Sequence, residues 1–499
     1  MHSVLSDFTP VYNRVLRLFE HISAVPRPSG HEEQIRNWLI QWAEQQNLSA
    51  KTDAFGNLVL YVPASPGCES APTVILQGHM DMVCEKKPHS NHDFSKDSIQ
   101  LIHDGDWLRA DGTTLGADNG IAIAIALAIA SSPEYRHPAL EICLTVEEET
   151  GLTGAANLDI SLLSGHILIN IDSEDEGVIT VGCAGGQDSN STIPLSRTSG
   201  DTSQQQLFVI EADGMLGGHS GVDIAQVRAN ALRVLGRALR EIEATHQDLH
   251  IISMYGGNAH NAIPRSAVAL VQLPDVSTIA DQLTQLAADL RHEFQPSETS
   301  ITLTILPYTQ APQHIRRYFA DTATSAPLTT ASQSAVVQAL LAYPHGVEKF
   351  SGVITGLVET SCNLATIRVH EHRAEFLLSQ RSSIASGLRA MTDRIRVITA
   401  LLGGQVENPN SYPMWEPDFS SPLLEHSRKL YQQRFGEAPV VETIHAGLEC
   451  GIIGAKQPGM EMISIGPTIQ YPHSPDERLH LPSLLKTVAF VTDLLASYV

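Results

Sequence analysis

The stretch TVILQGHMDMV, residues 73–83, has the pattern of a buried strand that ends in polar side chains, and it indicates the kind of fold to expect. The apolar run at residues 73–77 is strand-like, and His79 and Asp81 follow it directly. Further strand-like runs alternate with helix-like stretches at residues 14–22 and 32–46; the strand-like runs cover residues 57–62, 140–146 and 166–171. Such alternation is typical of an α/β sheet.

Residues 121–130, in which Ala alternates with Ile, are the most apolar run of the chain. A period of two would indicate a strand. We predict a buried helix instead, because the run is rich in Ala and begins just after Asp118-Asn119-Gly120, a cluster that favours a helix start.

The chain has 499 residues, too many for one ordinary hydrophobic core. From about Gly185 its character changes to polar segments such as residues 187–206, and then to a mixture of helix-like and strand-like stretches, as in an α+β insertion. The helix-like stretches are residues 227–245 and 279–294, and the strand-like ones are residues 208–211, 267–273 and 300–306. The pattern breaks again near Gly403, after which we expect residues 421–435 (helix), 460–465 (strand) and a final helix to return to the first sheet.

Composition excludes several classes of partner. The formal net charge is −23, from 55 acidic and 32 basic residues, and no stretch combines Lys and Arg with aromatic residues, so a nucleic acid is not expected as a partner. The run at residues 121–130 is about half the length of a membrane span, and the N-terminal segment lacks the apolar core of a signal peptide. The six cysteines form no C-x-x-C pair, so we expect reduced, mostly buried thiols in a cytoplasmic protein.

Acidic residues and histidines recur after the predicted strands. His79 follows the first run, Glu148 and Glu149 follow residues 140–146, Asp172 follows residues 166–171, and Asp118 precedes the predicted helix. Ligands of open α/β sheets collect at the carboxyl ends of the strands. Imidazole and carboxylate ligands suit zinc, cobalt or manganese, so the sequence predicts a metal site at this edge.

Neighbouring residues refine this prediction. Asp81 lies two residues from His79 on the same side of an extended segment, where it can accept the second ring N–H and orient the ligand. In Glu147-Glu148-Glu149 the like charges repel unless a cation or proton compensates them, so one carboxylate can bind metal while its neighbour handles a proton. Taken singly, such clusters are more often surface hydrogen bonds, solvated turns or helix caps; taken together at strand ends, they favour a site.

An ordered set of motifs from residue 15 to about 495 resembles the metallopeptidase family that includes carboxypeptidase G and the aminoacyl-histidine (Xaa-His) dipeptidases, with the strongest match to the latter. The motifs are QGHMDMV (77–83), GTTLGADNGI (112–121), TVEEETGLTGA (145–155), INIDSEDEG (169–177), GGHSG (217–221), NAIP (261–264), HAGLECG (445–451) and PHSPDE (472–477). The resemblance implies an α/β catalytic domain with a mixed central sheet flanked by helices, residues 1–185 and 401–499, and an inserted α+β lid domain, residues 186–400, joined through two hinges.

The resemblance also implies the roles of residues in the centre. Asp118 would bridge two divalent metal ions, with a cis peptide bond to Asn119. Zinc is the expected metal, and cobalt and manganese are the alternatives. His79 and Asp172 would bind one ion, Glu149 and His473 the other. Glu148 would be the general base for a metal-bridging water. Glu147 departs from the family, which has a neutral polar residue there; its extra charge could raise the proton affinity of Glu148, and its role stays open.

For the lid, the resemblance places His219 over the substrate carbonyl, and Asn261 and Arg381 on the terminal carboxylate of the substrate. A guanidinium suits that task because it binds a carboxylate with two parallel hydrogen bonds. His445 and Glu449 are expected near the pocket.

The resemblance therefore implies a dipeptidase acting on a small peptide, Xaa-His or broader, in a homodimer formed through the lids. Two alternatives stay open at this point. The chain could cleave N-acyl amino acids as an amidohydrolase, or it could be a catalytically silent binding protein on the same fold.

Overall fold

The computed structural model describes residues 5–198 and 206–499 and divides the chain into two compact units. Unit 1 comprises residues 1–183, 415–444 and 448–499, and unit 2 comprises residues 184–414 and 445–447. Each unit has its own sheet and its own hydrophobic core, as a chain of this length requires.

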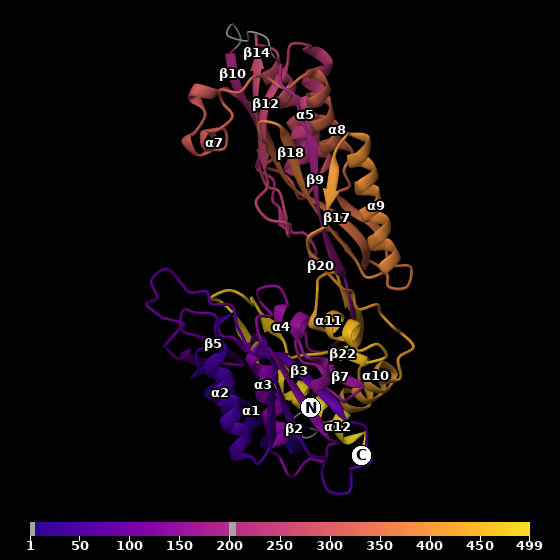
Figure 1. Cartoon of the computed structure of the whole chain (residues 1–499). Coiled ribbons are helices and arrows are strands. Elements are labelled where there is room, and N and C mark those ends of the chain that lie inside the picture. Colours follow the sequence, from indigo (N-terminus) through magenta and orange to yellow (C-terminus); the bar gives the residue numbers. More distant parts are fainter. Residues whose placement is uncertain (1–4, 199–205) are drawn as a thin grey trace. The chain divides into compact units, whose positions relative to one another are not determined.

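Unit 1 is built on an eight-stranded mixed sheet (Figure 1). Its strand order is β1 (Ser49–Thr52), β2 (Leu58–Val62), β6 (Leu140–Thr145), β3 (Val74–His79), β7 (Ile167–Asn170), β22 (Glu461–Ser464), β8 (Val178–Cys183) and β21 (Val440–Ile444). The strands β6, β3, β7 and β22 run parallel to their neighbours within this set, whereas β1, β2 and β8 supply antiparallel pairings. All six residues of β3 are buried, which explains the apolar run Val74–Leu76 with which the strand begins.

Helices cover both faces of this sheet. One face packs against α1 (Thr9–Ser23), α2 (Glu33–Gln45), α3 (Ala117–Ala130), α10 (Pro422–Phe435) and α12 (Leu481–Ala496). The other face packs against α4 (Thr153–Asn157) and α11 (Glu449–Lys456). Alternate residues of β3 serve the two cores, with Leu76 in the first and Ile75 in the second.

The helix α3 confirms the prediction for the Ala/Ile-rich run. Every residue from Asn119 to Ile129 is buried, because α3 lies between β3 and α1 and has no solvent face. A helix buried all round needs no amphipathic period, and small Ala side chains let the neighbouring elements approach closely. The same unit carries a small sheet of β23 (Ile469–Gln470), β24 (Arg478–His480), β5 (Trp107–Ala110) and β4 (Leu101–Asp104).

Unit 2 contains a ten-stranded sheet. Its main path is β15 (Thr302–Pro307), β10 (Gln206–Asp213), β14 (Ala267–Leu273), β12 (His250–Gly256), β17 (Val358–Val369), β18 (Arg373–Ser382), β9 (Gly185–Pro194) and β19 (Gln405–Glu407), while β16 (Gly346–Phe350) pairs with β17 and β20 (Ser411–Tyr412) pairs with β9. A separate two-stranded sheet joins β11 (Gly218–His219) to β13 (Ala262–Ile263).

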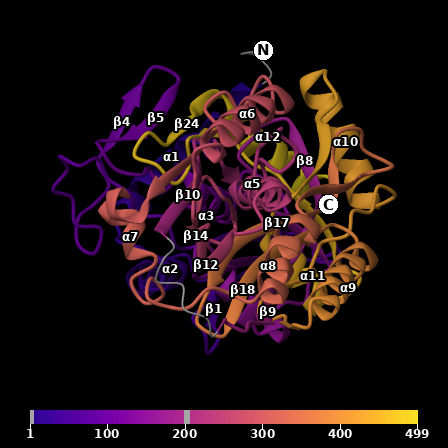
Figure 2. The ribbon, with the colours of Figure 1, turned by 90° about the horizontal axis from the view of Figure 1, so that it is seen from above.

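One face of the ten-stranded sheet carries α5 (Ala231–Thr245), α6 (Ile279–Glu293), α8 (Thr330–Ala342) and α9 (Ala385–Leu401). Figure 2 shows α5 and α8 side by side over the strands, in agreement with their direct packing. The opposite face packs against α7 (Gln313–Arg317) and the residues after it through Ile315 and Phe319. Unit 2 is therefore an α+β structure, as the pattern of its segments predicts.

Two features of unit 2 differ from the sequence prediction. The polar segment at residues 187–206 begins with a strand, β9, because Ser, Thr and Asn are accommodated by pairing with β18 on one side and β19 and β20 on the other; residues 199–205 of this segment lie outside the described residues. The pairing of β19 and β20 with β9 also extends the unit to Met414, beyond residue 400.

The remaining general predictions can be compared directly. All six cysteines are free thiols, and all except Cys84 are buried, as expected. In the part of the chain that the structure describes, no helix combines the length and the apolar character needed to cross a bilayer.

Candidate metal centre and active site

Three strands of unit 1 bring the predicted residues to one edge of the sheet. The strands β6, β3 and β7 are adjacent and parallel, so their carboxyl ends coincide, with His79 paired to Thr145 in the register. His79 ends β3, Glu148 and Glu149 follow β6, and Asp172 follows β7. The topology therefore places these side chains together although they lie far apart in the sequence.

The carboxylate of Asp118 lies between two imidazoles. Its Oδ1 is 3.1 Å from Nε2 of His79, and its Oδ2 is 3.1 Å from Nε2 of His473. Asp172 Oδ1 is 3.4 Å from the same nitrogen of His79, and Glu149 Oε2 is 3.1 Å from that of His473. Each oxygen of Asp118 thus faces a different histidine and a different acidic neighbour.

These donors form two groups that share Asp118. The first group is His79, Asp118 and Asp172, and the second is Asp118, Glu149 and His473; within each group the donor atoms lie within 4.8 Å of one another. A third combination joins His79 to Glu148 and Glu149. Nitrogen and carboxylate oxygen donors at this spacing fit divalent cations such as zinc, and Oε1 of Glu149, buried without a hydrogen-bond partner among the described residues, is an acceptor that a cation would satisfy.

The charges of the site also favour a bound cation. Burial by itself would lower the pKa of His79, but Asp172, Asp118 and Asp81 outweigh burial and raise it well above its usual value. Hydrogen bonds to Asp118 and Glu149 raise the pKa of His473 to about 11. Burial raises the pKa of Asp172 to about 6. The carboxylates therefore create a field that stabilises positive charge, which divalent cations would supply.

Asp81 holds both His79 and the glutamate loop. Its Oδ1 is 3.2 Å from Nδ1 of His79 and accepts the backbone N–H of Glu148, and its Oδ2 accepts the backbone N–H of Glu149 and the hydroxyl of Ser29. The contact to His79 is the one expected from the His-x-Asp spacing. The contacts to the backbone after β6 were not predicted, since no local sequence signal connects residues 67 or 68 positions apart.

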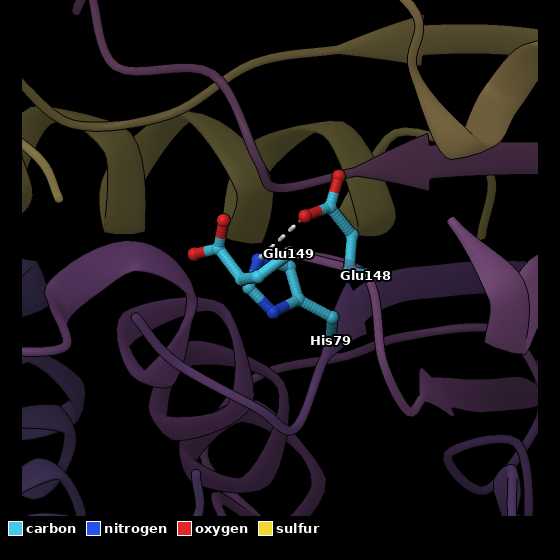
Figure 3. A group of neighbouring side chains, drawn as sticks. All are labelled: His79, Glu148 and Glu149. Carbon is cyan, nitrogen blue, oxygen red and sulfur yellow. Dashed lines mark ion pairs between the residues drawn. The ribbon is translucent and has the colours of Figure 1, made fainter. Parts of the chain in front are cut away.

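Glu148 and Glu149 differ in their surroundings although they are adjacent. Figure 3 shows Glu148 reaching toward the ring of His79, with 4.0 Å between Oε2 and Nε2, while the carboxyl group of Glu149 points away from that of Glu148. Burial raises the pKa of Glu148 well above its usual value, and the carboxylates of Asp172 and Glu449 add to this effect. Glu148 therefore has the high proton affinity that a proton carrier needs.

The side chain of Glu147 has a partner outside the metal-site residues. Its side chain turns to Thr153, whose hydroxyl donates to Oε2 at 2.9 Å, and its backbone has a positive φ of 50°. The carboxylates with the strongest effects on Glu148 are Asp172, Glu449 and Glu149. The turn after β6 directs the side chain of Glu147 to Thr153, so Glu147 is not among the groups with the strongest effect on Glu148.

The peptide bond between Asp118 and Asn119 is cis, which confirms the prediction. The side chain of Asn119 ties this turn to the strands, since its Oδ1 accepts the backbone N–H of His79 and its Nδ2 donates to the carbonyl of Ile171. The side chain after Asp118 thus links the ends of β3 and β7.

In unit 2, His219 is held in one tautomer. Its Nδ1 accepts the backbone N–H groups of Gly221 and Val222 at 3.2 and 3.1 Å, so the ring proton of the neutral imidazole lies on Nε2. Burial lowers the pKa of His219, and Arg381 lowers it further, which favours the neutral form. The ring therefore presents Nε2–H as a donor.

The loop that carries His219 is clamped by buried Glu298, which sequence reasoning missed. One carboxylate oxygen of Glu298 accepts the backbone N–H of Leu216, and the other accepts that of Ala229, both at 2.9 Å. Asp223 accepts the backbone N–H of His219 at 2.8 Å. Glu298 lies about 80 residues from His219, and only the tertiary structure relates them.

The other residues predicted in unit 2 occupy different settings. Arg381 is buried within β18, donates to the hydroxyl of Tyr412, and has an Nε without a partner among the described residues. His445 is also buried; its Nε2 is 2.7 Å from the hydroxyl of Ser361, and its Nδ1 has no partner in the described part of the chain. Asn261 is exposed in a loop, and its carbonyl accepts the backbone N–H of Ser220.

Glu449 is buried in unit 1, against two of the strands that carry metal-site residues. It begins α11, is 1% exposed, and its Oε2 accepts hydrogen bonds from Gln77 and Thr145 at 2.5 and 2.7 Å. Burial raises its pKa to about 7. Its hydrogen bonds to Gln77 and Thr145 support β3 and β6 next to the site.

The chain is similar to known peptidases over nearly its whole length. A model of peptidase family M20/M25/M40 matches residues 75–497. The cytosol non-specific dipeptidase of Escherichia coli K12 is 37% identical over 497 residues, covering 99% of each chain. The crystal structure of an aminoacylhistidine dipeptidase from Vibrio alginolyticus superposes with a TM-score of 0.85 at 36% identity, covering 98% of this chain and 97% of that one. An aminopeptidase PepT from Bacillus cereus shares the fold, with a TM-score of 0.55 at 14% identity and 98% coverage of both chains.

The shared position of Asp118 predicts the metal content of two variants. Asp118→Ala removes a donor from both groups, so metal-stripped protein reloaded with zinc should lose ions from both, whereas Glu149→Ala should lose mainly one. Equilibrium dialysis followed by elemental analysis measures this. Glu147→Ala is the matched control and should bind like the wild type. Full occupancy in Asp118→Ala would contradict the assignment.

Proposed function

Because the chain belongs to peptidase family M20/M25/M40, we propose that it is a metallo-dipeptidase, which hydrolyses the peptide bond of Xaa-His or a broader range of dipeptides. The observation that carries the proposal is the pair of donor groups sharing Asp118, each with one histidine and one further carboxylate. The similarity to a non-specific dipeptidase and to an aminoacylhistidine dipeptidase over nearly the whole chain supports the choice of substrate.

Two divalent ions are the proposed cofactor. All donors are imidazole nitrogens and carboxylate oxygens, which suit zinc, our first choice. Cobalt and manganese accept the same set of donors. His79 and Asp172 would hold one ion, Glu149 and His473 the other, and Asp118 both. When bound, such a pair polarises the peptide carbonyl and acidifies the attacking water.

Glu148 is the proposed general base and acid. Its carboxylate takes the proton of the attacking water and delivers it to the leaving amine. The raised pKa of Glu148 suits a group that must hold a proton between these two transfers. Asp81 keeps the loop of Glu148 in place through the backbone N–H, so a change at Asp81 would displace both His79 and the base.

Unit 2 is proposed to be the lid and to supply the groups that recognise substrate. The Nε2–H of His219 donates a hydrogen bond to the oxyanion that develops from the peptide carbonyl. Arg381, whose Nε has no partner among the described residues, binds the terminal carboxylate together with Asn261. Glu449 supports the site indirectly, because it accepts hydrogen bonds from Gln77 of β3 and Thr145 of β6.

Two alternatives remain distinguishable. An amidohydrolase of the same family would prefer N-acyl amino acids, which lack a free amine. A silent binding protein would bind metal without turnover, but the donor set together with Glu148 beside His79 favours catalysis.

The proposed location is the cytoplasm, supported by six free thiols and by the relative described as cytosolic. The proposed assembly is a homodimer formed through unit 2. The family resemblance is the ground for this proposal, and Val353 and Leu401 of unit 2, which are 74% and 82% exposed, are available to such an interface.

The substrate class is tested with a dipeptide panel that includes Xaa-His and the N-acetylated form of each peptide. Zinc-loaded protein should hydrolyse the free dipeptides, and acetylation should reduce kcat/KM because it removes the amine that a dipeptidase recognises. Faster cleavage of the acetylated peptides would establish the amidohydrolase alternative, and zinc binding with no turnover of any peptide would establish the silent one.

The roles of the two adjacent glutamates are separable by experiment. Glu148→Gln should keep both ions yet lower kcat by about 100-fold or more, because proton transfer is lost while the ligands remain. Glu149→Ala should lose metal, with activity falling partly for that reason. Metal analysis beside steady-state kinetics decides the matter, and a metal-depleted Glu148→Gln with a metal-replete Glu149→Ala would reverse the assignment.

The dimer is tested by sedimentation velocity at micromolar concentration. We expect one species with twice the mass of the 54.1 kDa chain, and Leu401→Lys should shift it toward monomer if α9 contributes to the interface. The exposed Val440→Lys in unit 1 is the control and should sediment like the wild type. A wild-type protein that sediments as monomer alone rejects the dimer.

A further inference from the structure

The buried carboxylate of Glu477 is bound by consecutive backbone amides. Its Oε2 accepts the N–H groups of Leu115 and Gly116 at 2.7 and 2.9 Å, and its Oε1 accepts those of Ala117 and Asp118 at 2.8 and 3.3 Å. Glu477 is only 2% exposed. All four N–H groups thus converge on one side chain, more than 350 residues away along the chain.

These amides belong to a turn that a helix cannot hold by its own hydrogen bonds. The first N–H groups of any helix lack a partner within it. In α3 more N–H groups lack an acceptor within the helix than usual, because Asp118 and Asn119 have non-helical backbone angles. The ψ of Asp118 is 106°, and Gly116 has a positive φ of 69°. Glu477 supplies the acceptors that the helix does not, so the direction of Asp118 depends on it.

Arg27 completes the arrangement from the other side of the turn. It is buried, and it donates to the carbonyl of Gly116 and to the carbonyls of Met80 and Asp81, the last two at 3.1 and 2.9 Å. Glu477 is the acidic group that most strongly compensates the charge of Arg27. The pair therefore connects the turn before Asp118 to the segment that follows His79.

The position of Glu477 in the chain adds a second connection. It lies four residues after His473, whose Nε2 faces Oδ2 of Asp118 at 3.1 Å. A displacement of Glu477 would move the loop of His473 and the turn of Asp118 together. One anchored side chain thereby controls the spacing between donors from two distant segments.

We propose that Glu477 is a positioning residue that sets the geometry of the metal centre before metal binds, by fixing the turn of Asp118 and tying it to the loop of His473. The inference rests on the proposed metal-binding function of Asp118 and His473. Glu477 itself is not assigned as a ligand, because both of its oxygens are occupied by backbone amides.

The test compares Glu477→Gln with a matched change at Glu141. Glutamine keeps the size of the side chain but directs an NH₂ group at two of the four backbone donors, so the turn loses acceptors. Glu141 is likewise buried and accepts the backbone N–H groups of Ser164 and Gly165, but it lies four residues before the end of β6, about 13 Å along the strand. Glu141→Gln therefore reproduces the chemical change away from the site.

The readout is zinc affinity, measured by titrating metal-stripped protein against a competing chelator, with the unfolding midpoint of the stripped protein recorded in parallel. Glu477→Gln should weaken binding at both sites by about 10- to 100-fold, the usual effect of losing a residue that orients ligands. Glu141→Gln should bind zinc like the wild type, even where its midpoint falls equally. Wild-type affinity at both sites in folded Glu477→Gln overturns the inference. Failure of the wild type itself to bind two ions would instead reject the proposed metal centre.

A measurement on the wild type covers the case in which Glu477→Gln does not fold. Hydrogen exchange of the amides of residues 115–118 should be slow in metal-stripped protein, because Glu477 accepts their hydrogen bonds without metal. Addition of zinc should change this protection little. Rapid exchange that becomes slow only with zinc would show that metal, and not Glu477, orders the turn, and would overturn the inference.

Discussion

The interaction on which the candidate centre depends is the carboxylate of Asp118 between His79 and His473. It connects three segments that are distant in the sequence: the end of β3, the turn before α3 and a loop between β23 and β24. Asp172 and Glu149 each approach one of the two histidines, so the symmetry of the arrangement follows from the two oxygens of a single side chain. Moving Asp118 would separate the two donor groups.

The position of that carboxylate is a consequence of parallel strand order. Since β6, β3 and β7 run in the same direction side by side, the residues after each strand emerge at one edge, and α3 packs against β3 with its first turn at the same edge. The same strand order therefore explains both patterns: β3 and α3 are apolar because they are buried, and the residues that flank them are polar because they lie at the edge of the sheet. Burial provides the low dielectric that makes the charges of the centre strong.

Buried carboxylates that accept backbone N–H groups recur through both units. Asp81 orders the loop of Glu148 and Glu149, Glu477 orders the turn of Asp118, and Glu298 orders the loop of His219. In each case a charged acceptor satisfies donors of irregular backbone that no regular ladder reaches, and charge-assisted hydrogen bonds of this kind are stronger than neutral ones. These hydrogen bonds thus hold the loops of the candidate site residues in place where regular secondary structure does not.

Three features could be predicted from local patterns of apolar and polar residues: the alternation of strands and helices in unit 1, the buried helix α3, and the candidate residues at the strand ends. Burial and strand direction leave such patterns in the sequence. The ligand set with His473 and the roles in the inserted unit came from resemblance to a family rather than from such patterns. The fold was needed to show that the polar residues of β9 form an interior strand, that Glu147 turns to Thr153, and that Glu477 and Glu298 hold distant loops. Most of these contacts join residues tens to hundreds of positions apart, so they depend on where the chain folds back, which no local periodicity encodes.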